Sequence, residues 1–200
     1  MMNKQIYVNL TKISSSLVLA VAIALLLLIV NPASALADTN PVELAKAVEE
    51  IEYLDQMRSG LAATLDKETI PDQGTFKKVC QPVGMQAKKL SQENGWQVQQ
   101  IARKYRNPDH AAKDLQSVMA LAKFEHNPQL IGFWNRESRN EQTGTSYYRR
   151  IDVQASCLAC HGRKNNRPEF VKDKYPQDLA YDFKVGDLRG MYTVFIPDLQ

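Results

Sequence analysis

Two of the three cysteines and one of the three histidines of the chain stand together in the stretch ASCLACHGRK, residues 155–164. Cys157 and Cys160 are separated by two residues, and His161 follows directly. This CxxCH pattern is the attachment signature of a c-type haem, in which both thiols add to the haem vinyl groups and the histidine binds the iron. We predict one covalently attached haem c, with Cys157 and Cys160 as anchors and His161 as proximal ligand. The alternatives are a chance match and a redox disulfide, although redox CxxC motifs normally lack the adjacent histidine.

The second axial ligand of such a haem has several candidates in the sequence. They are Cys80, His110, His126, Met57, Met85, Met119 and Met191. Met119 and Met191 lie on apolar stripes, where methionine is more often core filling than a ligand. Cys80 differs because haem attachment would consume its two possible disulfide partners, which leaves a buried, inert thiol or an iron ligand. A thiolate ligand would stabilise ferric iron and lower its reduction potential.

The first 37 residues have the layout of a cleavable signal peptide. Two lysines precede fourteen apolar residues, 17–30, and an Ala-Leu-Ala sequence ends at Ala37. The apolar run is shorter than the ~20 residues that span a bilayer, so we expect cleavage after Ala37 rather than an uncleaved membrane anchor. We therefore expect export to the periplasm or the thylakoid lumen. Residues 38–200 would form one haem-binding domain that does not span a membrane.

Charge gives no reason to expect nucleic acid as a partner. The chain carries 25 Lys and Arg against 22 Asp and Glu, and removal of the leader lowers its net charge from +3 to +1. Basic clusters remain at 102–106 and 147–150, which we interpret as solvated faces, with pairing to haem propionates as the alternative. The sequence has no Ser/His/Asp constellation, phosphate loop or second metal cluster, so we do not expect an enzyme.

The first half of the mature chain is predicted to be helical. Thr39 or Asn40 can cap a long amphipathic helix, with Pro41 in its first turn. A second apolar stripe, 76–90, contains Cys80. Pro82 interrupts this stripe, because a proline deep in a helix loses a backbone hydrogen bond, so the helix either kinks there or begins near Cys80. The second option would place the sulfur at the positive end of the helix dipole, which favours thiolate.

Strands are expected mostly in the second half. A further helix is predicted over 109–124, and its apolar face would consist of Leu115, Val118, Met119 and Ala122. Alternating, β-branched or aromatic residues predict strands within 96–105, 145–153 and 191–196. This order of elements indicates an α+β fold.

Four segments carry a resemblance that extends over residues 38–200. They are KVCQPVGMQAKKLSQENGWQV, KYRNPDH, SYYRRIDVQASCLACHG and YDFKVGDLRGMYTVFIP. Through them the chain resembles the cyanobacterial extracytoplasmic monohaem proteins that have a PAS-like domain and His/Cys axial haem ligation. The resemblance implies a PAS-like antiparallel sheet flanked by helices and preceded by a long N-terminal helix. It also implies His161 as the fifth iron ligand and Cys80 as the sixth.

Two functions fit these expectations. The first is a redox or small-gas sensor, in which a replaceable Cys80 thiolate lets the iron change ligation on reduction or on meeting CO or NO. Because a single domain would use up residues 38–200, an unidentified redox or signalling protein would have to read that change. The alternative is a low-potential electron carrier, which would keep the same ligands in both oxidation states.

Overall fold

The computed structural model describes residues 40–65 and 70–198, so the predicted leader lies outside the described residues. Its longer elements are α2 (Pro41–Ala63), α3 (Gln73–Val79), α4 (Gln81–Asn94), β1 (Gln97–Ile101), α5 (Leu115–His126), β2 (Gly132–Arg139), β3 (Gln142–Asp152) and β4 (Leu188–Pro197). Shorter helical turns are η1 (Pro108–His110), η2 (Ala155–Cys157), α6 (Leu158–His161), η3 (Lys164–Asn166) and α7 (Glu169–Lys174). None of the helices in these ranges is long and apolar enough to span a membrane.

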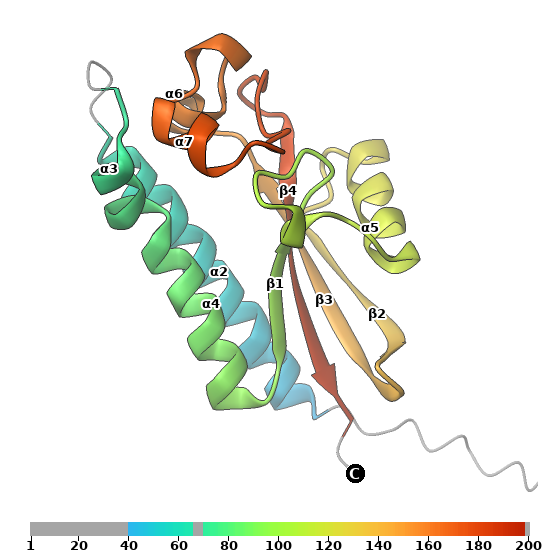
Figure 1. Ribbon diagram of the computed structural model, residues 1–200. Coiled ribbons are helices and arrows are strands. Elements are labelled where there is room, and N and C mark those ends of the chain that lie inside the picture. Colours follow the sequence, from blue (N-terminus) through green and yellow to red (C-terminus); the bar gives the residue numbers. More distant parts are fainter. Residues whose placement is uncertain (1–39, 66–69, 199–200) are drawn as a thin grey trace, which may run out of the picture. The chain divides into compact units, whose positions relative to one another are not determined.

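Four antiparallel strands form one sheet in the order β1-β4-β3-β2 (Figure 1). The helices α2 and α4 run along one face of this sheet, and α5 lies against the other. The expectation of an α+β fold, with an antiparallel sheet flanked by helices and a long helix at the start, is therefore confirmed.

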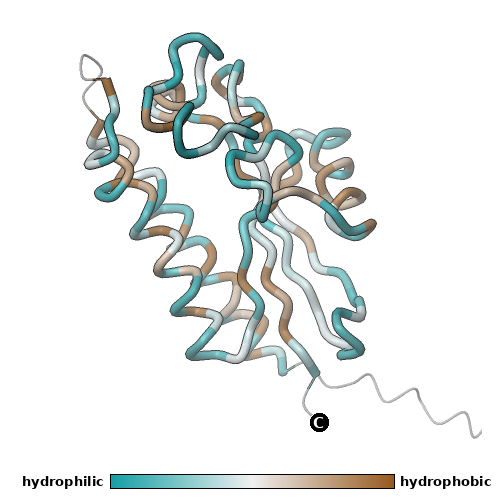
Figure 2. The backbone as a smooth tube through the Cα atoms, viewed as in Figure 1, coloured by the Kyte–Doolittle hydropathy of each residue, from teal (hydrophilic) through white to brown (hydrophobic). Residues whose placement is uncertain are grey.

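The central strand β4 supplies the core on both faces of the sheet, because its side chains alternate in direction. Tyr192, Val194 and Ile196 pack with α2, whereas Met191 packs with α5. All of these residues are at most 1% exposed. Figure 2 shows the apolar colour along this central strand and hydrophilic colour over many of the connecting loops. The strand from 191 to 196 was predicted, and it is the most buried strand of the fold.

The start of α2 follows the predicted cap. The Asn40 side chain accepts the Val42 N–H at 3.0 Å, and Pro41 occupies the first turn. Ala47, Ile51 and Leu54 are completely buried against the sheet. The long amphipathic helix expected here is therefore confirmed, with its end at Ala63.

The strand β2 was not predicted. It pairs with β3 through a two-residue turn at Asn140 and Glu141, whose φ angles are 49° and 66°. Positive φ at both central residues matches a type I′ hairpin turn, which sequences usually mark with Asn-Gly or Asp-Gly. Glu141 stands where glycine is expected, so residues 127–144 carry no local hairpin signal.

The prediction for α5 was wrong in its start and in its buried face. Residues 108–110 form the separate turn η1, and α5 begins after Asp114, whose carboxylate accepts the Ser117 N–H at 2.7 Å. The buried positions are Ser117, Ala120, Leu121 and Phe124. Phe124 selects this face because its ring packs 5.3 Å from that of Phe133 on the sheet. Leu115 and Met119, both predicted to face the core, are 67% and 62% exposed.

Candidate haem site

The CxxCH motif lies in the long connection between β3 and β4. Cys157 ends η2, and the next four residues form the single-turn helix α6, which ends at His161. The Gly162 N–H closes this turn by donating to the Leu158 carbonyl at 2.9 Å. A Cβ atom on Gly162 would lie only 2.6 Å from that carbonyl oxygen, so the tight exit from α6 requires glycine.

The imidazole of His161 has a defined orientation. Its Nδ1 atom lies 2.8 Å from the Ala180 carbonyl oxygen, which can only accept, and 3.2 Å from Arg106 Nη2, which can only donate. The shorter contact to Ala180 favours a proton on Nδ1. The Nε2 atom of the neutral ring then keeps a free lone pair, which is the arrangement of a metal-binding histidine. Surrounding protein atoms, followed by the charges of Arg189 and Arg106, hold the pKa of His161 well below its ordinary value. The ring is therefore neutral.

Cys80 approaches the CxxCH motif from the helical layer. It ends α3 and precedes α4, with Pro82 in the first turn of α4. Of the two options for this stripe, a helix beginning near Cys80 is thus the one observed. The thiol is exposed, yet surrounding protein atoms raise its pKa, and nearby Cys157 adds to this rise while Arg106 and Arg189 oppose it. We refer to the neighbourhood that Cys80 shares with Cys157, Cys160 and His161 as the recess.

A charge on one cysteine thiol in this neighbourhood affects the pKa of another. Burial raises the pKa of Cys160, and a charge on Cys80 would raise it further, while Arg106 lowers it. Cys80 is thus a neighbour of Cys157 and Cys160 in the fold, although almost 80 residues separate it from them in the sequence. Within residues 40–65 and 70–198 no group of three or more His, Cys, Asp or Glu side chains is arranged to hold a bare metal ion. A haem iron differs from a bare ion because its porphyrin supplies four nitrogens, so the protein need provide only two ligands.

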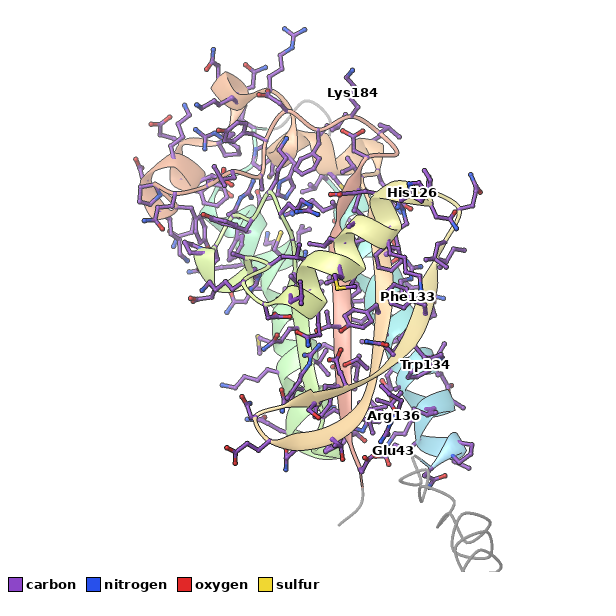
Figure 3. All side chains as sticks on the ribbon, turned by 90° about the vertical axis from the view of Figure 1, so that its right-hand side faces the viewer. Glu43, His126, Phe133, Trp134, Arg136 and Lys184 are labelled. Carbon is purple, nitrogen blue, oxygen red and sulfur yellow. The ribbon has the colours of Figure 1, made fainter. Side chains whose placement is uncertain are left out.

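The other candidates for the second ligand are less well placed. His126 is exposed at the end of α5, on the opposite face of the sheet from α2 (Figure 3). His110 is exposed at the end of η1, where surrounding atoms and then the charge of Arg189 lower its pKa. Met191 is fully buried in the core under α5, as predicted, whereas Met85 and Met119 are more than 60% exposed. Met57 lies partly buried on α2.

Three arginines surround the recess. Arg58 Nη1 lies 3.8 Å from Cys157 Sγ, and Arg106 Nη2 donates to the Cys160 carbonyl at 2.7 Å. The Nε of Arg106 is buried without a hydrogen-bond partner in the described part of the chain; its ion-pair partner Asp178 is 3.6 Å away. Burial, followed by the charge of Arg106, lowers the pKa of Arg189 to about 10.

These arginines were only partly foreseen. Arg106 belongs to the basic cluster at 102–106, for which propionate pairing was the alternative interpretation. In the cluster at 147–150 the arginines have protein partners, since Arg149 pairs with Glu52 at 2.9 Å and with Asp55 at 3.3 Å, and Arg150 bonds the Phe124 carbonyl. Arg58 and Arg189 had no local sequence signal, because each is an isolated arginine that only the fold brings to the motif.

Comparison with known proteins places the chain in a family. The family model described as Tll0287-like matches residues 37–197. This chain belongs to the Tll0287-like family. Among solved structures it is similar to the cyanobacterial heme-protein Tll0287, with 57% sequence identity and a TM-score of 0.73. The match covers 81% of this chain and 99% of that structure.

No functionally curated protein matches this Tll0287-like chain. The family resemblance predicted from the four sequence segments is confirmed, and so is the fold that it implied. The boundary at residue 37, the haem attachment and the axial ligands remain predictions, to which the geometry of the recess now adds support.

Proposed function

We propose that this Tll0287-like chain binds one haem c covalently and acts as a redox or small-gas sensor. Cys157 and Cys160 would form the thioether bonds, and His161 and Cys80 would be the axial ligands. The related heme-protein Tll0287 supports the cofactor, and the CxxCH spacing supports its covalent attachment. The observation that carries the proposal is that Cys80, at the start of α4, lies close enough to the CxxCH cysteines for a charge on one thiol to affect the others.

The residues of the recess fit a haem in charge as well as in ligands. Haem propionates are anionic, and Arg58, Arg106 and Arg189 bring guanidinium groups to the same place. The buried Nε–H of Arg106 has no hydrogen-bond partner and only a longer ion pair with Asp178 at 3.6 Å, so a propionate carboxylate at hydrogen-bond distance would be a suitable acceptor. Bidentate pairing with carboxylates is a characteristic use of arginine.

The two proposed ligands are held to different degrees. His161 is fixed by its hydrogen bond to Ala180 and by the tight turn at Gly162. Cys80 lies at a junction between two helices, and the seven-residue α3 contacts α7, which follows the CxxCH motif, through the rings of Phe76 and Phe170, 6.2 Å apart. This asymmetry favours Cys80 as the exchangeable ligand. The iron would supply a one-electron couple and, once a coordination position opens, a site for CO or NO.

The N-terminal segment fits this role. The family match begins at residue 37, next to the predicted cleavage site, which supports a leader that precedes the haem domain. Export to the periplasm or the thylakoid lumen would explain a covalent link, since cofactor lost outside the cell is not easily replaced.

Spectroscopy of the purified protein and of Cys80→Ala tests the proposal. Ferric and dithionite-reduced samples, with and without CO, are compared by absorption and electron paramagnetic resonance, with His126→Ala as a control on the other face. We expect a thiolate-type low-spin ferric signal that is lost only in Cys80→Ala, and CO binding by the reduced wild type. An unchanged signal in Cys80→Ala would refute the ligand assignment. A reduced protein that stays low-spin and refuses CO would favour an electron carrier instead.

A further inference from the structure

The charges of this chain are unevenly distributed between the proposed haem site and the rest of the domain. We define the haem-site end as residues 73–79, 102–113 and 154–189. These segments contain thirteen Lys and Arg but six Asp and Glu, a balance of +7. The remaining described residues contain nine Lys and Arg and thirteen Asp and Glu, a balance of −4. Haem propionates would reduce the positive excess without reversing it.

Direct contacts join the three segments into one end of the domain. The Leu179 N–H donates to the Tyr105 carbonyl at 2.8 Å, which ties 154–189 to 102–113. The ring of Phe170 lies 6.2 Å from that of Phe76, and Lys174 Nζ lies 5.2 Å from the Phe76 ring, which ties it to α3. The positive charges therefore gather around the recess rather than along the whole surface.

Most of these positive charges face solvent. Eight of the thirteen basic residues are exposed: Lys77, Lys78, Arg103, Lys113, Arg163, Lys164, Lys174 and Lys184. Four of the six acidic residues are exposed: Asp109, Glu169, Asp173 and Asp182. Figure 3 shows Lys184 at this end and Glu43 near the opposite end of the domain. Two arginines are balanced by acids outside these segments: Arg58, which also borders the recess, by Asp55 at 2.8 Å, and Arg103 by Glu125 at 2.7 Å.

A charge separation of this kind orients a protein as it meets a charged partner. Opposite charge at the contact face raises the association rate, and this effect falls steeply with salt. We propose that the haem-site end is a docking surface for an acidic redox protein, which exchanges an electron with the haem across this end. The inference rests on the proposed haem and goes beyond it, because it assigns the partner's charge and the face that it meets.

Small redox reagents of opposite charge test the sign of the field at the haem. The purified haem protein is reduced by dithionite, whose active species is the anionic SO2 radical, and by the cationic methyl viologen radical, over 10–200 mM ionic strength. We expect added salt to slow the first reaction and to speed the second. The same salt response for both reagents would overturn the proposal, because the field at the haem would then not be positive.

Paired lysine variants test the location. Lys77→Gln/Lys78→Gln removes two exposed charges from the haem-site end, and Lys88→Gln/Lys89→Gln removes two from further along α4. At 10 mM salt and a distance of roughly 10 Å, Coulomb's law in water gives about a threefold slower reaction with dithionite for the first pair. The second pair should change the rate by less than about 1.5-fold. Equal effects of the two pairs would overturn the assignment of the face.

A protein probe tests the partner. Reduced acidic plant-type ferredoxin should transfer an electron to the haem at a rate that falls with salt and falls again in Lys77→Gln/Lys78→Gln. Binding to anionic phospholipid vesicles without any reaction with ferredoxin would overturn the proposal in favour of a membrane surface. The spectra of the same samples report the axial ligands, so a failure of the Cys80 assignment is seen separately from a failure of the docking surface.

Discussion

The ring contact between α3 and α7 should control how firmly Cys80 binds the iron. Phe76 lies one turn before Cys80, and its carbonyl accepts the Cys80 N–H at 3.0 Å. Its ring packs on Phe170, which belongs to the segment that follows the CxxCH motif. Loss of this contact would leave α3 less constrained near the recess without touching either proposed ligand.

The expected effect follows from the size of an aromatic contact. Such pairs contribute about 0.5–1.5 kcal/mol beyond their buried area, which corresponds to roughly 2- to 13-fold in an equilibrium constant. Phe170→Leu should therefore lower the equilibrium constant for binding of Cys80 to ferric iron by this factor. Added imidazole, which must displace Cys80, should then bind with a dissociation constant lower by the same factor in an absorption titration.

A second aromatic pair provides the matched control. Phe133 stacks on Tyr148 with ring centroids 5.0 Å apart, on the face of the sheet that α5 covers (Figure 3). Phe133→Leu should destabilise the fold but leave the imidazole affinity unchanged. Unchanged affinity in Phe170→Leu, with native circular dichroism, would refute the reasoning. An equal shift in both variants would point to general loosening instead.

Two further predictions concern the fold alone. Burial, followed by the bond from its hydroxyl to Glu137, raises the pKa of Tyr148 to about 12 from an ordinary 10.0. A raised folded-state pKa favours the neutral phenol, so this stabilisation is complete below pH 10 and should decline by up to about 2–3 kcal/mol as pH rises to 12. Urea unfolding between pH 9 and pH 12 measures it, and Tyr148→Phe should make the decline less steep, because the raised pKa values of Tyr147 and Tyr192 remain. Glu141→Gly should stabilise the hairpin by about 0.5–1 kcal/mol, because glycine adopts the φ of 66° at this position without strain. Thermal unfolding at fixed pH measures this effect. A lower melting temperature of the variant would contradict the prediction.

The sequence predicted those helix boundaries and strands that depend on neighbouring residues, and it failed where the structure depends on residues far apart in the chain. The strand 191–196 rests on a few adjacent residues and is observed. Asn40 was one of two candidate caps and a helix start near Cys80 one of two options, and the structure selects both. The buried face of α5 was wrong because Phe124 packs on a strand that had not been predicted. Sequence pattern could not reveal which face of that helix the sheet would cover.

The candidate site shows the same division. The CxxCH motif is a local pattern, and the resemblance to a known family implied Cys80 as its distant partner. Arg58 and Arg189 are different, because only the antiparallel sheet and the packing of α2 bring them to Cys157 and His161. The residues next to Arg58 and Arg189 in the sequence therefore do not indicate that these arginines lie near the CxxCH motif.

The proposed ligands come from positions about 80 residues apart in the chain, one before the first strand and one before the last. A bond from each to the same iron would act as a cross-link that closes a loop of that length. For a disulfide, closing a loop of this size removes about 4–5 kcal/mol of unfolded-state conformational entropy in the chain-entropy model. The domain would then have two stabilities, one with the loop closed and one with Cys80 released, so its melting temperature would itself depend on the oxidation state of the iron.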